Sequence, residues 1–197
     1  MKKYEEKKFT IGTLTGLSER QIAEHLKLYA GYVKHVNLIA ENVEELSSNS
    51  EKNAYLISEL RRRFAFEFDG MRMHEFYFES FEEGKREHES GSTLGAAIAE
   101  QFGSFDNWLT QFKTVALSRG IGWTVLSRDP RSGSLINHYA GDHELGHLAG
   151  LDIIIALDMW EHAYMIDYTP GEKKQYVEAF LSNLNWRVPE GRFNRET

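Results

Sequence analysis

The sequence predicts an α+β fold: an N-terminal antiparallel helical hairpin, then a mixed domain with a small, about three-stranded antiparallel sheet flanked by helices. The three prolines of this 197-residue chain are Pro130, Pro170 and Pro189, so none interrupts a long helix in the first half. Apolar residues recur there at helical spacing. Runs rich in β-branched residues and bounded by turn residues occur in the second half, which predicts strands.

The first half reads as two long helices. Ser18 is the predicted N-cap of a helix over residues 19–46, and the polar run 47–50 is its predicted end. A second helix is predicted from residue 51 to 68, with an extension to about residue 78 across the weak point Asp69-Gly70. Two long helices joined by a short polar turn form an antiparallel hairpin. Its inward face is expected to carry Ile22, Leu26, Tyr29, Val33, Val36 and Ile39.

The charged, Gly- and Ser-bearing stretch 82–92 has no apolar period and predicts a boundary. We therefore expect an N-terminal unit over 1–89 and a C-terminal unit over 90–197. Helices and strands of the second unit are shorter, and Pro, Gly and Ser mark its turns. Helices are predicted over 93–102, 105–118, 161–167 and 171–185, two strands within 121–140, and a buried strand over 151–157.

Composition excludes several classes of function. The chain carries 23 Lys+Arg against 30 Asp+Glu, a net charge of −7, which argues against a nucleic-acid partner. It has no cysteine, so disulfides, zinc-thiolate sites and cysteine nucleophiles are excluded. The N-terminus lacks the apolar core of a signal peptide, and no apolar run is long enough for a membrane span. We expect a cytoplasmic protein.

Eight histidines and many carboxylates raise the question of a metal site, since imidazole and carboxylate suit zinc, iron or manganese. The segment His143-Glu144-Leu145-Gly146-His147 matches H-E-x-x-H, the zinc motif of metallopeptidases, in which the glutamate is the general base. That motif needs a helix, and this stretch is glycine-rich and lies between two predicted strands. A polar loop with incidental histidines is the alternative interpretation.

A second set of residues is quieter. Asp158 ends the apolar strand and His162 follows one helical turn later, so both can face one point; a capping box of Asp158 with Glu161 is the alternative. His74 stands among aromatic residues, and His25 lies on the apolar side of the first helix. A single histidine on such a face is usually a packed core residue, but three of them with an aspartate at a strand end favour a shared metal site.

Several segments resemble the iron/manganese superoxide dismutase family. LDMWEHAYMIDY is similar to that family's D-x-W-E-H-A-Y-x-x-D-Y signature, and EAFLSNLNW to its closing E-A-F-x-x-x-x-N-W. HEFYF resembles the family's H-x-F-Y-W, while QFGSFDNWLTQF and GIGWTVL resemble the helix and strand before the signature. The likeness extends over about residues 17–187, and the predicted hairpin and mixed domain agree with the family's architecture.

The resemblance implies the metal ligands His74, Asp158 and His162, with a fourth from the first helix. In the family a histidine lies eight residues before a Tyr-Val pair at the substrate entrance. Here Tyr32-Val33 is preceded by His25 at seven residues and by Glu24 at eight. We choose His25 as the ligand, with Glu24 as the alternative, because a one-residue deletion with loss of a π-bulge restores the match.

The resemblance also implies a residue that hydrogen-bonds the metal-bound solvent. Where the family has a Gln four residues before the second ligand, this chain has Gly70, so we assign the role to His143, with Tyr32 as a second proton-handling residue. The implied activity is disproportionation of superoxide at one Fe or Mn ion per chain. Glu161 is expected near a homodimer interface. Phe76, Tyr77, Trp123 and Trp160 are expected to line the pocket.

Two other functions stay open on the sequence alone. A zinc metallopeptidase would use His143, Glu144 and His147. A non-catalytic relative of the family would keep the fold for binding or assembly, which the altered first helix and the unusual N-terminus favour. Neither alternative predicts the same metal and the same substrate as a superoxide dismutase, so metal content and a superoxide assay distinguish all three.

Overall fold

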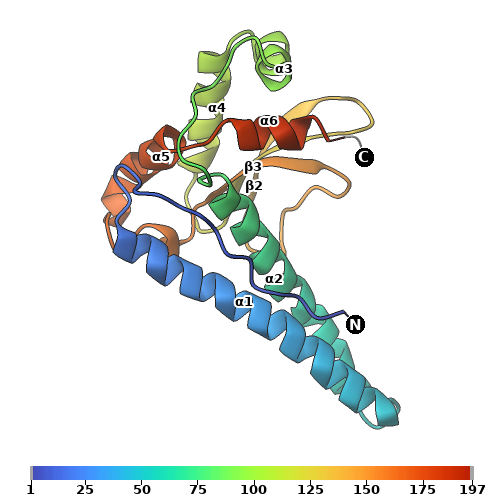
Figure 1. The fold of residues 1–197 in the computed structure, drawn as a ribbon. Coiled ribbons are helices and arrows are strands. Elements are labelled where there is room, and N and C mark those ends of the chain that lie inside the picture. The colour runs from blue at the N-terminus through green and yellow to red at the C-terminus, as the bar shows by residue number, and fades with distance from the viewer. Residues whose placement is uncertain (1, 196–197) are drawn as a thin grey trace.

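Two long helices and a three-stranded sheet form the framework of the protein (Figure 1), and the computed structural model describes residues 2–195. The predicted α+β class is confirmed. The helices are α1 (Glu19–Leu46), α2 (Ala54–Glu79), α3 (Thr93–Phe102), α4 (Phe105–Ala116), α5 (Lys173–Ser182) and α6 (Arg187–Phe193). The strands are β1 (Trp123–Arg128), β2 (Leu135–Ala140) and β3 (Asp152–Asp158), and short 3-10 turns are η1 (Ser47–Asn49), η2 (Glu161–Ala163) and η3 (Pro170–Glu172).

The helices α1 and α2 form the predicted antiparallel hairpin (Figure 1). Ser18 caps α1, since its side chain accepts a hydrogen bond from the Gln21 N–H at 3.0 Å. The second helix begins at Ala54 and continues without a break through Gly70. The extended N-terminal segment runs along the hairpin, where Asn37 of α1 bonds both the N–H and the C=O of Tyr4.

The sheet has the strand order β2-β1-β3, and both pairs are antiparallel. Trp123 at the start of β1 lies opposite Ala140 at the end of β2 and opposite Asp158 at the end of β3. Directly opposed residues of antiparallel strands point to the same face of the sheet. The register therefore sets the indole and the carboxylate side by side at one end of the sheet.

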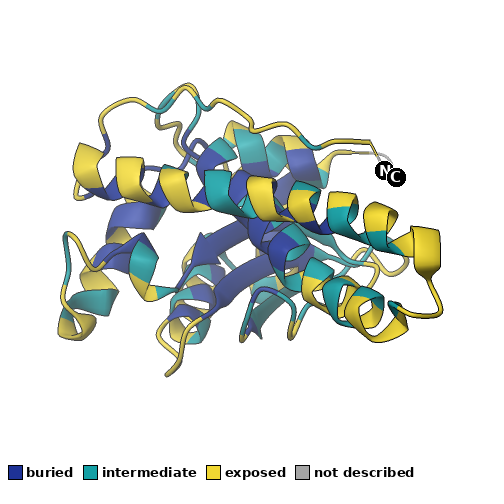
Figure 2. Ribbon diagram, turned by 90° about the horizontal axis from the view of Figure 1, so that it is seen from below, coloured by how far each residue is buried: buried dark blue, intermediate teal, exposed yellow. Residues whose placement is uncertain are grey.

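The buried core lies where the hairpin meets the sheet. Figure 2 shows buried segments concentrated around the strands and the adjoining parts of the helices, while the turn end of the hairpin is exposed. The helix α2 packs against β3, α4 packs against β1 and β2, and α6 packs against β3. No helix in the described part of the chain has the length and apolar character that a bilayer crossing requires.

The predicted helix over 161–167 is wrong, because only the 3-10 turn η2 forms there. In an α-helix the Ile166 N–H would donate to the His162 C=O. Instead the side-chain amide of Gln21 lies between them: its Nε2 donates to the His162 C=O at 2.7 Å, and its Oε1 accepts from the Ile166 N–H at 3.0 Å. A residue from α1 thus replaces the bond that would have continued the helix.

The C-terminal helical prediction is also corrected. The expected helix over 171–185 is shorter and follows η3 as α5, and the separate helix α6 was not predicted. Pro189 discourages a helical interpretation of its surroundings, yet it lies in the first turn of α6, where its missing N–H needs no helical partner.

Candidate metal centre

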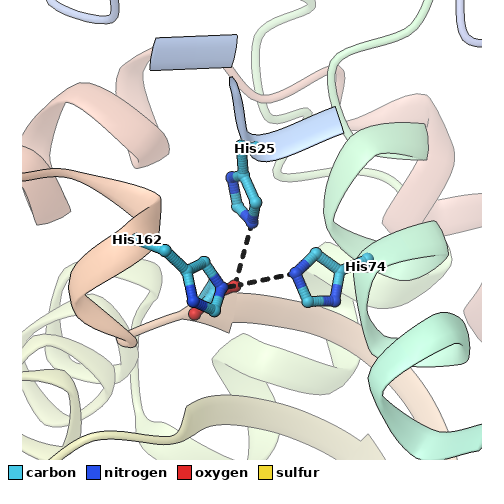
Figure 3. Close-up of side chains that lie close together, drawn as sticks. His25, His74 and His162 are labelled. Atoms are coloured by element: carbon cyan, nitrogen blue, oxygen red, sulfur yellow. Dashed lines mark hydrogen bonds and ion pairs between the residues drawn. The ribbon is translucent and has the colours of Figure 1, made fainter. Parts of the chain in front are cut away.

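Four side chains from four different elements converge on one point inside the protein. His25 comes from α1, His74 from α2, Asp158 from the end of β3, and His162 from η2. Their candidate ligand atoms all lie within 4.8 Å of one another. The Nε2 atoms of His25, His162 and His74 lie 3.1, 3.2 and 3.6 Å from Oδ2 of the aspartate. Figure 3 shows the three imidazoles directed at this common point.

The spacing and the donor set fit a single metal ion. Atoms held about 2.1 Å from one ion lie about 3.0–3.6 Å apart when they subtend about 90–120° at it. Three imidazoles and one carboxylate suit iron, manganese or zinc. The Nε2 of His74 is buried and has no hydrogen-bond partner, which is costly unless the atom binds a ligand. The His162 side chain is 21% exposed, whereas the other three side chains are fully buried.

The protonation of the ligands also favours metal binding. The Nδ1–H of His74 donates to the Gly70 C=O at 2.6 Å, so its Nε2 presents a lone pair to the centre. Burial lowers the pKa of His25 and, more strongly, of His74, which keeps both imidazoles neutral. Burial raises the pKa of the Asp158 carboxyl, but its interactions with His162 and His25 outweigh this, so the pKa lies well below its usual range. These are the deprotonated forms that bind a metal.

Neighbouring groups fix the orientation of the aspartate. Its Oδ1 accepts a hydrogen bond from the Trp160 N–H at 2.8 Å, and its backbone carbonyl accepts one from the Tyr176 hydroxyl at 2.7 Å. Asp158 therefore keeps Oδ2 for the centre. The alternative capping box of Asp158 with Glu161 does not form, because η2 begins at Glu161 itself, with Trp160 as the preceding residue and without a side-chain cap bond.

A hydrogen-bonded set of three side chains borders the centre. The indole Nε1–H of Trp123 donates to Nδ1 of His143 at 3.0 Å, and Nε2 of that imidazole lies 2.7 Å from the Tyr32 hydroxyl oxygen. Since an indole N–H can only donate, Nδ1 carries the lone pair, and the neutral imidazole carries its proton on Nε2. Burial lowers the pKa of His143 to about 4 and raises that of Tyr32, so both are uncharged near neutral pH.

Gly70 provides the space for the Tyr32 ring. A Cβ atom added at Gly70 would lie 2.7 and 2.8 Å from the Cδ1 and Cε1 atoms of that ring. A side chain at this position is incompatible with the observed place of Tyr32. The imidazole that bonds the Tyr32 hydroxyl thus comes from the loop after β2, at His143, while α2 leaves the space that the Tyr32 ring fills.

The structure separates the two candidates in the first helix. His25 is buried in the cluster, whereas Glu24 is exposed and pairs with Lys27 at 2.7 Å. The helix α1 is regular throughout, without a π-bulge. Seven residues at about 100° each fall about 20° short of two full turns, so Tyr32 faces the same side as His25. The seven-residue spacing therefore suits a regular helix.

The H-E-x-x-H segment does not form the helix that a zinc peptidase needs. Residues 143–147 lie in the irregular loop between β2 and β3. Both ring nitrogens of His143 are engaged by Trp123 and Tyr32, and Nε2 of His147 donates to the His143 C=O at 2.6 Å. The two imidazoles do not share a ligand position, so the interpretation as a zinc motif is wrong for this arrangement.

Aromatic rings surround the candidate ligands as predicted, except that Phe78 takes the place expected for Phe76. Tyr77 packs on His25 and Trp123 packs on His74, with ring centroids 4.9 and 5.1 Å apart. Phe76 instead lies under the guanidinium of Arg192, 4.8 Å from its ring centroid, because it points away from the His74 side of α2. Two residues were missed: Phe78, which packs 4.9 Å from His25, and the buried Gln21. Their offsets of four residues from a ligand, His74 and His25 respectively, were the available signal.

Trp160 stacks on the loop residue His143 and on the candidate ligand His162. Its ring centroid lies 4.8 Å from that of His143, at an interplanar angle of 27°, and 5.8 Å from that of His162, at 15°. The residue was expected to line the pocket, and it joins the hydrogen-bonded set to the cluster.

Comparison with known proteins gives the same class of protein. The family described as iron/manganese superoxide dismutases, C-terminal domain, matches residues 89–192. A superoxide dismutase [Fe] of Cupriavidus metallidurans is 38% identical over 187 residues, covering 91% of this chain and 90% of that protein. A superoxide dismutase [Fe] of Aquifex aeolicus is 32% identical over 187 residues (92% and 86%), and a superoxide dismutase [Mn] of Mycolicibacterium smegmatis is 33% identical over 174 residues (88% and 82%).

These similarities, together with the fold, define a metal-dependent oxidoreductase class. The chain belongs to the iron/manganese superoxide dismutase family. Membership supports a superoxide dismutase function for the protein, and the cluster of His25, His74, Asp158 and His162 could hold a metal ion.

Proposed function

We propose that this protein converts two superoxide ions and two protons to oxygen and hydrogen peroxide at one iron or manganese ion held by His25, His74, Asp158 and His162. The observation that carries the proposal is the convergence of three imidazole Nε2 atoms on one carboxylate oxygen in a chain of this family. When bound, the ion supplies one-electron exchange with superoxide. The protein must supply ligands, protons and a closed pocket.

The protons are the task of Tyr32 and His143 in this proposal. The Nε2–H of His143 donates to the Tyr32 oxygen, so the hydroxyl proton of Tyr32 is free to point toward the centre. The centroid of the Tyr32 ring lies 5.0 Å from that of His74, so Tyr32 borders the centre beside one of its candidate ligands. Trp123 holds the tautomer in which this donor chain runs in one direction.

The aromatic residues exclude bulk water around the ligands. Tyr77, Phe78 and Trp123 are fully buried and contact the imidazoles of His25 or His74. A dry surrounding strengthens hydrogen bonds and charge interactions inside the pocket. The packed rings also hold the ligand imidazoles in fixed orientations.

The protein is proposed to act as a homodimer with Glu161 at the interface. Glu161 directly precedes the partly exposed candidate ligand His162. The Glu161 carboxylate makes no hydrogen bond or ion pair with any described residue, so it is available to a second copy of the chain. Met165 and Ile166, close by in sequence, are 48% and 41% exposed. Light scattering should give a mass near twice that of the chain, and Met165→Lys should shift it toward the monomer.

We also propose that the chain consists of two units, over residues 1–89 and 90–197, and that the protein acts in the cytoplasm. The site needs both units, because His25 and His74 come from the first and Asp158 and His162 from the second. Separate expression of residues 1–89 should therefore give a chain that binds no iron or manganese tightly.

The experiment that tests the function pairs metal analysis with superoxide consumption. The purified protein should contain about one iron or manganese ion per chain and should consume superoxide with formation of hydrogen peroxide. A protein that contains the ion but leaves superoxide unconsumed would be a non-catalytic relative. Zinc with peptide hydrolysis that requires Glu144 would instead indicate a peptidase.

A further inference from the structure

The loop between β2 and β3 carries His143 to the centre but has little backbone structure of its own. Over residues 141–151 it contains no helix or strand, and its backbone makes one internal hydrogen bond, from the Leu151 N–H to the Leu148 C=O at 3.3 Å. Loops with few backbone hydrogen bonds open easily. The position of His143 therefore depends on side-chain contacts.

The second histidine of the H-E-x-x-H segment makes one of these contacts. Nε2 of His147 donates to the His143 C=O at 2.6 Å, and the ring thereby closes the turn that spans residues 143–147. On the other side of the same residue, Oδ1 of Asp142 accepts from the His143 N–H, also at 2.6 Å. Both backbone polar groups of His143 are thus bound by neighbouring side chains. The donor role of His147 holds in its neutral Nε2–H form and in its charged form alike.

Gly146 permits this closed turn. Its φ of +92° is a conformation that residues with side chains rarely adopt, and a Cβ atom there would lie 3.0 Å from Cα of Ala140. The turn is therefore pressed against the end of β2. His147 follows directly and reaches back to His143 across Glu144 and Leu145, of which Leu145 is 61% exposed.

We propose that His147 is a positioning residue: by binding the His143 carbonyl it holds the His143 imidazole between Trp123 and Tyr32. This inference rests on the proposed function, because the imidazole that His147 positions belongs to the proton-donor chain of that site. Hydrogen-bonded donors are effective only within narrow limits of distance and direction, so a displacement of about 1 Å can cost up to about a hundredfold in rate. The H-E-x-x-H segment accordingly supplies one residue at the centre and one that holds it.

The test uses variants of the full chain that remove or keep the donor. His147→Leu removes it, His147→Gln keeps an amide N–H donor, and Glu144→Gln changes the same loop without touching the bond. With metal content matched, we expect His147→Leu to lower kcat about five- to tenfold, His147→Gln to recover most of that loss, and Glu144→Gln to stay within about twofold. Should His147→Leu fold poorly, His147→Phe keeps a ring without a donor and is held to the same outcomes.

A double-mutant cycle tests whether His147 acts through His143. In a His143→Ala background, His147→Leu should cost less than about twofold, since the residue that it positions is gone. An equal loss in both backgrounds, or wild-type kcat in His147→Leu, would overturn the proposal.

A readout in the metal-free protein separates this inference from the proposed function. The indole N–H resonance of Trp123, assigned by Trp123→Phe, reports the bond to His143. We expect it to move upfield or broaden in His147→Leu and to keep its position in His147→Gln and Glu144→Gln. An unchanged resonance in His147→Leu contradicts the positioning role even if the enzyme is active. A wild-type protein without superoxide dismutase activity contradicts the function, whatever the resonance does.

Discussion

The helices and the connecting segments contribute to the candidate metal centre and its surroundings by different means. His25 and His74 lie on regular helices, fully buried, and their places follow from helical periodicity. His143 and His162 lie on a loop and on a 3-10 turn, and hydrogen bonds with the side chains of Trp123, Tyr32, His147 and Gln21 hold their rings or their backbone. Metal content and activity should therefore depend on the helix-borne histidines only when one of them is removed. For His143 and His162, they should also depend on the remote residues that support them.

The largest expected effect is the loss of a helix-borne ligand. His74→Ala removes an imidazole that no neighbour can replace, so metal content should fall far below one ion per chain and activity at least about a thousandfold. His35→Ala, also a helix-borne histidine but with a side chain 54% exposed, is the matched control and should keep both. Full activity in metal-loaded His74→Ala would show that this helix-borne histidine is not an essential ligand.

Gln21→Leu tests the support of the 3-10 turn. The change leaves the partly buried His162 C=O and Ile166 N–H without their partner, which should destabilise the protein by about 1–3 kcal/mol and weaken metal retention. Urea unfolding with metal analysis measures both. The adjacent, exposed Arg20→Ala should change the free energy of unfolding by less than about 0.5 kcal/mol. An unaffected Gln21→Leu variant would show that η2 needs no help from α1.

Gly70→Ala tests the space that α2 leaves for the Tyr32 ring. The added methyl group meets the Tyr32 ring, so the ring and its bond to His143 must shift. We expect about a tenfold lower kcat and a loss of about 1–2 kcal/mol in stability. Gly31→Ala, also within a helix but with open space around its added Cβ, should instead stabilise by about 0.5–1 kcal/mol. Equal kcat and equal free energies of unfolding for the two variants would show that the space at Gly70 is not needed for the position of Tyr32.

The smallest expected effect concerns pH and Glu79, the last residue of α2. Burial raises the pKa of Glu79, but hydrogen bonds from Lys7 and Arg192 outweigh it, so the pKa in the folded protein lies below its usual value. A lowered folded pKa stabilises the protein above the unfolded value and loses this contribution as pH falls through the folded pKa. The contribution should be at most about 1 kcal/mol, because the group is partly exposed.

Glu79→Gln is the variant that checks this. Between about pH 6 and pH 3, its free energy of unfolding should fall less steeply than that of the wild type. Glu178→Gln, which removes an exposed pair with Lys113, is the control and should leave the slope nearly unchanged. Identical slopes for Glu79→Gln and the wild type would contradict the assignment.

The sequence was informative where one element determines its own conformation. The two long helices, the N-cap at Ser18 and the strand that ends at Asp158 follow from periodicity, capping and β-branched composition. The aromatic surroundings of His25, His74 and His162 and the place of Asp158 at a strand end favour a shared site, but no local pattern joins residues so far apart in the chain, and the resemblance supplies the complete ligand set.

Other features depend on contacts between distant segments, which a local pattern does not contain. The helix predicted after Asp158 fails because Gln21 occupies its hydrogen-bonding groups from another element. Phe76 is expected in the pocket with the other aromatic residues that the resemblance implies, but its offset of two residues from His74 points it to another side of α2. The match of residues 143–147 to a zinc motif does not show that the His147 imidazole binds the His143 backbone carbonyl.

Anomalous diffraction from crystals of the metal-loaded protein, recorded on both sides of the iron and manganese absorption edges, tests the central claim most directly. We predict one iron or manganese peak per chain, about 2.0–2.3 Å from Nε2 of His25, His74 and His162 and from a carboxylate oxygen of Asp158. A peak bound instead by His143 or His147, or no peak among the four side chains in a protein that retains its metal, would contradict it.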